Sequence, residues 1–222
     1  MNMSFIDFRL LSIWFIPGLL AITLHEAAHA YAAYKLGDYT AKGQGRLTLD
    51  PFNHVDITGT IVLPLVFLLL QSPFLFGYAK PVPVVSSNFK RPKLGLAIVA
   101  ICGPLANFFM ALGWGLLLKL TLMGYLHALS NPIFLQWFSQ TCQIGVHFNI
   151  ILLVFNMIPI PPLDGSKCLA YFLPYPYDKR YSDLEEHGLI ILMTAFWLTP
   201  LQRVMLFCTS FIFDIIRYAI IF

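Results

Sequence analysis

The stretch Leu20-Ala-Ile-Thr-Leu-His-Glu-Ala-Ala-His-Ala30 carries the clearest chemical signal in the chain. His25 and His29 are four residues apart, so on a helix their side chains share one face about one turn apart. Two neutral imidazoles at this spacing can hold one zinc ion, and the carboxylate of Glu26 between them can act as a general base. The stretch therefore predicts a helix that carries part of a catalytic zinc site.

The setting of this motif is apolar. Residues 10–34 carry no other charged side chain than Glu26, and the run is long enough to cross a bilayer. Ionisable groups at membrane depth are costly and mark functional sites. The alternative is that His25 and His29 are bonded to helix carbonyls, but Glu26 would then be buried without a counter-charge. The pattern favours a zinc site inside a membrane helix.

The composition indicates an integral membrane protein. Hydrophobic residues make up 58% of the 222 residues, charged residues only 11%, and the mean hydropathy is +0.73. Soluble domains carry about 25% charged residues. The net charge of +3 is small and scattered, which argues against nucleic-acid binding. We expect an all-α polytopic membrane protein with about four to six membrane segments, folded as one domain over residues 1–222.

Apolar runs locate these segments. Membrane helices are predicted over 10–34, 94–118, 133–158 and 188–222, the last interrupted by Pro200 and forming either a half-helix and a helix or a tight pair. A further apolar run at 57–79 is broken by prolines and glycines. Basic residues concentrate more strongly on one side of the membrane if this run enters and leaves on the same side. We therefore expect 57–79 to be re-entrant or only partly spanning, with the N-terminus outside.

Two polar stretches have extended character. Residues 43–49, which read GQGRLTL, alternate as a short strand would. Residues 80–85, which read KPVPVV, are expected to be extended because each proline disfavours helix in the residue before it.

A catalytic zinc needs three protein ligands and one open position. Asp164 is the best third ligand, because it follows the proline-broken end of the 133–158 span and an unwound backbone can turn it towards a facing helix. The alternative for Asp164 is an Asp-Gly turn at the membrane surface. His147, deeper in the same span, is a second candidate, although a polar histidine bonded to a neighbouring helix is favoured there. Interfacial solvation accounts for the histidines at span ends, which are His54, His127 and His187.

Three motifs together resemble the site-2 protease family of intramembrane zinc metalloproteases, in its compact bacterial branch without PDZ or CBS domains. They are HEAAH at 25–29, GPLAN at 103–107 and NMIPIPPLDG at 156–165. The resemblance implies one zinc per chain on His25, His29 and Asp164, with Glu26 as the general base. It also implies substrate-binding roles for Asn156 and Asn107. Residues 40–50 and 78–88 would form a small membrane-associated β-structure beside the site.

The same resemblance implies a function. The chain would hydrolyse peptide bonds in or near transmembrane segments, as in regulated intramembrane proteolysis. Its partners would be the lipid bilayer and single-span membrane proteins or signal-peptide remnants, and it would be a multi-pass protein of the cell (inner) membrane. Two other functions stay open, namely a catalytically silent membrane binding protein or adaptor and a zinc or proton transporter. Transporters favour paired carboxylates across several helices and internal repeats, and the sequence has no such repeat.

Overall fold

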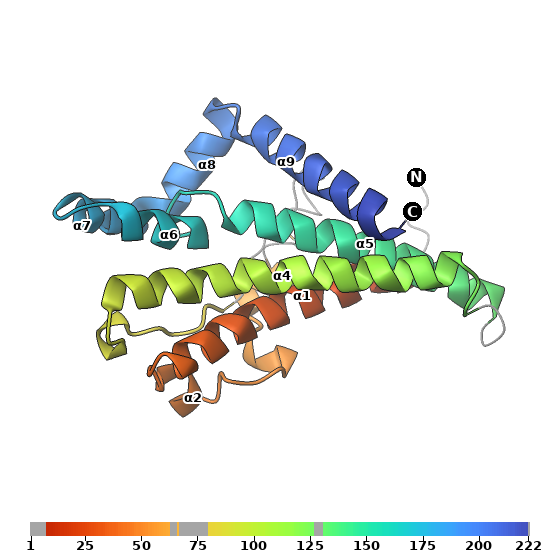
Figure 1. The fold of residues 1–222 in the computed structure, drawn as a ribbon, viewed down its shortest axis with the longest axis horizontal. Helices are drawn as coiled ribbons and strands as arrows, with labels where there is room; N and C mark the ends of the chain where they lie inside the picture. Colours follow the sequence, from red (N-terminus) through yellow and green to blue (C-terminus); the bar gives the residue numbers. More distant parts are fainter. Residues whose placement is uncertain (1–7, 63–65, 67–79, 127–130, 222) are drawn as a thin grey trace.

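Three long helices lie side by side and form the centre of the fold (Figure 1). The computed structural model describes residues 8–62, 66, 80–126 and 131–221. The central helices are α1 (Phe8–Lys35), α4 (Pro92–Leu122) and α5 (Pro132–Asn156). Each of the three packs against the other two.

Shorter helical elements connect the central helices and extend the fold. Between α1 and α4 lie α2 (Thr40–Gly43), η1 (Pro51–Asn53), η2 (Ile57–Val62) and η3 (Ser86–Asn88). After α5 follow α6 (Asp164–Phe172), α7 (Tyr177–Ser182), η5 (Asp183–His187), α8 (Gly188–Leu198), α9 (Leu201–Ile216) and η6 (Arg217–Ile221).

The described helices agree with a multi-helix membrane protein. Among them, α4 and α5 each have the length and apolar composition of a membrane span. The bent pair of helical segments that contains α8 and α9 adds a third span if the pair is counted as one span. That pair bends by 84° at Thr199-Pro200, where the sequence predicts an interruption. Helix α1 includes the whole predicted run 10–34. The total of about four to six segments stays a prediction.

Small side chains let the central helices approach closely. Ala32 and Ala33 of α1 pack with Val99 of α4. Further along, Ala111 of α4 and Val146 of α5 are buried with Ile216 of α9, whose C-terminal end reaches α5 in Figure 1. Because these contacts bury apolar side chains on several helices at once, they hold α1 and α5 against α4.

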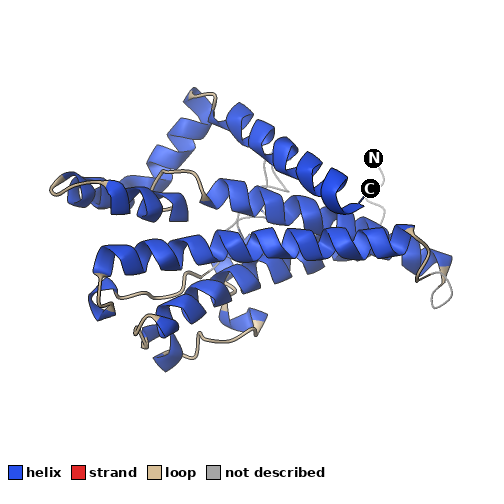
Figure 2. Cartoon of the chain, in the orientation of Figure 1, coloured by secondary structure: helices blue, strands red, loops and turns tan. Residues whose placement is uncertain are grey.

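The predicted β-structure is not confirmed, because none of the residues that the structure describes lies in a strand (Figure 2). Within 40–50, residues 40–43 form α2 instead, and Gly45 follows with a positive φ of 69°. Residues 80–85 lie in neither a helix nor a strand, Val85 has extended dihedral angles, and Pro81 and Pro83 have no N–H to donate to a ladder. The segment is held by side chains instead.

The re-entrant prediction for 57–79 lies largely outside the described residues. Its first part, Ile57–Val62, is the helical element η2, whose backbone bonds are of the π type. Residues 78 and 79 of the predicted β-structure also lie outside the described part of the chain.

Candidate metal centre

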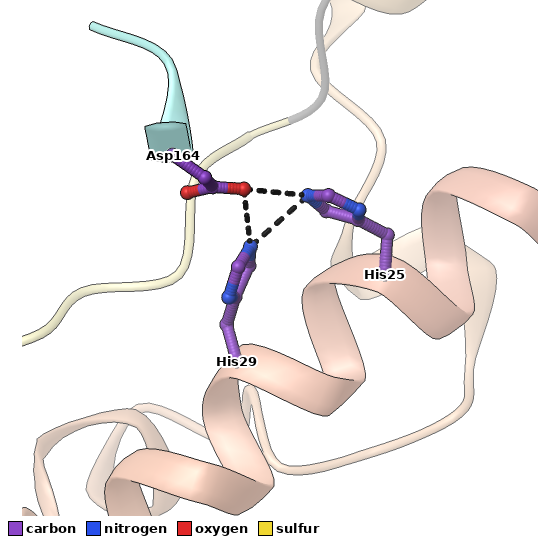
Figure 3. Close-up of side chains that lie close together, drawn as sticks. All are labelled: His25, His29 and Asp164. Atoms are coloured by element: carbon purple, nitrogen blue, oxygen red, sulfur yellow. Dashed lines mark hydrogen bonds and ion pairs between the residues drawn. The ribbon is translucent and has the colours of Figure 1, made fainter. Parts of the chain in front are cut away.

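Three buried side chains from distant parts of the chain meet at one point (Figure 3). His25 and His29 lie on α1, and Asp164 is the first residue of α6. Nε2 of His25 is 3.0 Å from Nε2 of His29, and Oδ2 of Asp164 is 3.2 Å and 3.1 Å from these two nitrogens. The structure therefore brings together the three side chains that the sequence analysis grouped.

Local chain geometry explains this meeting. The helical repeat of α1 sets the two imidazoles a turn apart, with their rings at 88° to one another. Helix α5 ends at Asn156, and the chain resumes a helix only at Asp164. The intervening prolines Pro159, Pro161 and Pro162 cannot continue a helix, so the chain turns back and brings Asp164 to α1.

Neighbouring groups fix the tautomers of both histidines. Nδ1 of His25 lies 2.6 Å from Oδ1 of Asn107, and Nδ1 of His29 lies 2.8 Å from the carbonyl oxygen of Val99. Both oxygens only accept, so each Nδ1 carries the hydrogen and donates it. Each Nε2 then presents a lone pair to the centre of the cluster. This arrangement, with the second ring nitrogen bonded to an oxygen, is typical of metal-ligating histidines.

The centre of the cluster lacks a donor. Oδ2 of Asp164 is buried and, within the described part of the chain, receives no hydrogen bond. Two imidazole lone pairs and a carboxylate oxygen thus face one another, an arrangement that needs a proton or a cation between them. Tetrahedral zinc ligands lie about 3.3–3.4 Å apart when each bond is about 2.0–2.1 Å. The observed separations of 3.0–3.2 Å and the donor set fit one zinc ion.

Two glycines allow the backbone to come this close. A Cβ on Gly103 of α4 would overlap Nε2 of His29 and lie 2.6 Å from Cε1 of His25. A Cβ on Gly165 would overlap the carbonyl oxygen of Met157. Glycine at 103 therefore lets α4 cover the two histidines, and glycine at 165 lets the turn fold against the end of α5.

Glu26 is half-buried beside the cluster and contacts the segment 80–85. Its Oε2 accepts a hydrogen bond of 3.0 Å from the backbone N–H of Val82. Nη2 of Arg46 donates to the carbonyl oxygens of Lys80 and Pro81 at 3.2 Å each, which holds the start of the segment. The segment is thus fixed to the residue that the sequence analysis assigned as the general base.

Asp38 holds the other end of this segment. Oδ2 of Asp38 accepts from the N–H of Val85 at 2.7 Å, and Oδ1 accepts from Nδ2 of Asn88 at 2.8 Å and from the N–H of Thr40 at 3.0 Å. Burial alone would raise the pKa of Asp38, but the hydrogen bonds from Thr40, Val85 and Asn88 outweigh it and hold that pKa below its usual range. Asp38 therefore anchors the segment as a carboxylate.

The two asparagines predicted to bind substrate have different surroundings. Asn107 is fully buried, and its side chain is bonded to His25, so the structure places it behind a candidate metal ligand. Asn156 donates from Nδ2 to the carbonyl oxygen of Leu152 in its own helix at 3.0 Å. Substrate binding by either residue stays a prediction.

The remaining histidines lie apart from the cluster. His147 is exposed, bonds the carbonyl oxygen of Gln143 and stacks on Phe213 of α9. His54 is buried and bonded to the carbonyl oxygen of Thr48. His187 is exposed at the end of η5, and His127 lies outside the described residues. Of the described candidates for a third ligand, Asp164 is the one beside His25 and His29.

Sequence reasoning missed Asn149, which is fully buried in α5 and bonded to Asn107. The signal was present, because an amide in an apolar span needs partners just as a carboxylate does. The contact between Val82 and Glu26 had no signal in the sequence, since every residue except proline carries a backbone N–H.

Comparisons with known proteins find relatives that share most of the chain. It is 39% identical over 186 residues to the protein named "Putative zinc metalloprotease YwhC" of Bacillus subtilis, a match that covers 82% of this chain and 78% of the relative. Proteins named "Putative zinc metalloprotease Rip2" match at 25% identity in Mycolicibacterium smegmatis and 29% in Mycobacterium tuberculosis. These matches cover 83% and 80% of this chain, and 66% and 64% of the relatives. No profile of a protein family matches, and no solved structure matches.

Proposed function

The chain belongs to the site-2 protease family, and on that premise we propose that it is an intramembrane zinc metalloprotease. It hydrolyses peptide bonds in or near the transmembrane segments of other membrane proteins. The zinc ligands are His25, His29 and Asp164, one ion per chain, and Glu26 is the general base. The names of the relatives support a zinc metalloprotease, and the apolar helices α4 and α5 support a location in the membrane.

One observation carries this proposal. The lone pairs of two neutral imidazoles and one carboxylate oxygen converge in a buried place, at mutual distances of 3.0–3.2 Å. Three protein ligands with room for a further one are the hallmark of catalytic rather than structural zinc. Bound zinc would supply Lewis-acid chemistry, polarising the scissile carbonyl and making water more acidic.

The residues of the chain divide the remaining tasks. Glu26 takes a proton from the attacking water and later gives it to the leaving amine. The N–H of Val82 holds the Glu26 carboxylate in place. Asn107 and the carbonyl of Val99 keep the Nδ1 hydrogens on His25 and His29, so that each Nε2 stays available as a ligand.

Substrates must present an extended backbone to this site. Amides in an intact helix are hydrogen-bonded to one another, so the substrate helix has to unwind locally before cleavage. Residues 80–85 lie beside Glu26 outside any helix and offer a backbone against which an unwound segment can lie. Asn156, in the NMIPIPPLDG motif, would bind backbone groups of the substrate that are freed when its helix unwinds. Single-span membrane proteins and signal-peptide remnants of the inner membrane meet these requirements.

Cleavage in liposomes tests the proposal. Wild type and Glu26→Gln would be reconstituted with zinc and a panel of single-span substrates labelled at both ends. Glu185→Gln is the matched control, because Glu185 is an exposed acid in η5. We expect cleavage by wild type and Glu185→Gln, and none by Glu26→Gln. Equal cleavage by Glu26→Gln would contradict the role of Glu26. Zinc flux across the liposome membrane without cleavage would favour a transporter.

A further inference from the structure

Asn149 is fully buried on α5, and its polar side chain is hydrogen-bonded there rather than only packed against apolar groups. Its Nδ2 donates to the carbonyl oxygen of Gly145, one turn earlier, at 2.8 Å. Its Oδ1 accepts from Nδ2 of Asn107 on α4 at 3.0 Å. Since a carbonyl oxygen accepts and never donates, the bond to Gly145 fixes which end of the Asn149 amide faces Asn107.

Asn107 is oriented by two acceptors at once. Its Nδ2 donates one hydrogen to Oδ1 of Asn149 and the other to the carbonyl oxygen of Ala21 on α1, at 3.2 Å. With both of its hydrogens used, Asn107 turns its Oδ1 towards Nδ1 of His25, 2.6 Å away. That oxygen accepts, so His25 carries its hydrogen on Nδ1 and keeps Nε2 free for a metal.

We propose that Asn149 is a positioning residue for the metal centre. It holds the amide of Asn107 in one orientation and thereby fixes the tautomer of His25. The chain of contacts runs from Gly145 through Asn149 and Asn107 to His25, and each link allows one direction of donation. This inference rests on the proposed function, because it assumes that His25 is a zinc ligand.

The physical effect comes from the competing orientation of Asn107. If its amide rotates by half a turn, Nδ2 faces Nδ1 of His25, which must then accept, and the hydrogen moves to Nε2. A protonated Nε2 has no lone pair for zinc. Asn149 disfavours this orientation, because two amide oxygens would then face each other in a buried place of low dielectric constant. Without Asn149, the carbonyl of Ala21 is the remaining acceptor for Nδ2 of Asn107.

Zinc affinity measures this effect directly. Asn149→Leu keeps the branched shape and the number of heavy atoms of the side chain and removes both hydrogen-bonding groups. Thr141→Val is the matched control, because Thr141 is also buried on α5 and bonds a carbonyl one turn earlier, that of Trp137. Zinc dissociation constants of the full-length variants would be measured in detergent by competition with a chelator. Cobalt absorption spectra and melting temperatures would be recorded beside them.

We expect Asn149→Leu to bind zinc about 10-fold more weakly than wild type, as is usual when an outer partner of a metal ligand is lost. Its cobalt spectrum should change, because the orientation of His25 changes. Thr141→Val should lose some thermal stability and keep the affinity and spectrum of wild type. Equal zinc affinity in wild type and Asn149→Leu would overturn the inference and leave the proposed function standing. A wild type that binds no zinc would overturn both.

Discussion

The backbone N–H of Val82 donates a hydrogen bond of 3.0 Å to Oε2 of Glu26, which lies 56 residues earlier in the chain. The segment 80–85, which contains Val82, is held at one end by Arg46 and at the other by Asp38. The proposed general base and the segment beside which a substrate would lie are therefore one connected unit. A shift of the segment would move the carboxylate as well.

Replacing Val82 tests this connection. Val82→Pro removes the N–H and suits an extended backbone, whereas Val82→Ala shortens the side chain and keeps the N–H. A hydrogen bond to a charged group contributes about 1.5–3 kcal/mol, so Val82→Pro should lower kcat by about 10- to 100-fold. Steady-state kinetics on a single-span substrate would measure this. A Val82→Ala variant as slow as Val82→Pro would assign the effect to the lost side chain instead.

The low pKa of Asp38 predicts a pH dependence of stability. A carboxylate whose pKa is lower in the folded state stabilises the fold above its unfolded pKa of about 3.9. This contribution is lost as the pH falls through the lower, folded pKa. Asp38→Asn should therefore be less stable than wild type at pH 7, by about 2 kcal/mol, because its amide cannot accept all of the existing hydrogen bonds.

The difference in stability between wild type and Asp38→Asn should shrink as the pH is lowered below 3.9. Melting temperatures in detergent across a pH series would show it. A difference that stays constant from pH 7 to pH 3 would mean that Asp38 contributes no charge-dependent stability.

Gly103 predicts a steric effect on the metal centre. Gly103→Ala would place a Cβ against Nε2 of His29 and Cε1 of His25. We expect zinc binding and cleavage to fall by at least about 10-fold, because the imidazoles must move from their ligand positions. Gly113→Ala is the control on the same helix, since a Cβ there meets no described atom within 4 Å. Metal analysis after dialysis would compare the two. Full zinc content in Gly103→Ala would show that the histidines can adjust.

Local chain rules account for the parts of the site that could be predicted. The four-residue spacing of His25 and His29 decides their common face wherever the helix lies. The prolines before Asp164 rule out a continuous helix, so a turn of the chain towards a facing helix could be expected. Neither inference needed knowledge of the packing of distant elements.

Contacts between distant elements could not be predicted in the same way. The alternating pattern at 43–49 suggested a strand, but a strand needs a partner with free donors, and Pro81 and Pro83 have none. The family resemblance implied a substrate-binding role for Asn107, and its motif says nothing about which way α4 is turned. The packing of α4 on α1 turns it towards His25. Such details depend on helix rotation, which composition and spacing leave open.

The zinc content of purified protein is the sharpest test of the proposed ligand set of His25, His29 and Asp164. Wild type, Glu26→Gln, Asp164→Ala and the control Asp183→Ala, which changes an exposed acid of η5, would be purified in detergent and their zinc counted per chain. We expect close to one zinc in wild type, Glu26→Gln and Asp183→Ala, and a clear loss in Asp164→Ala, because Asp164 supplies a third ligand and Glu26 none. Full zinc content in Asp164→Ala, or none in wild type, would contradict this ligand set.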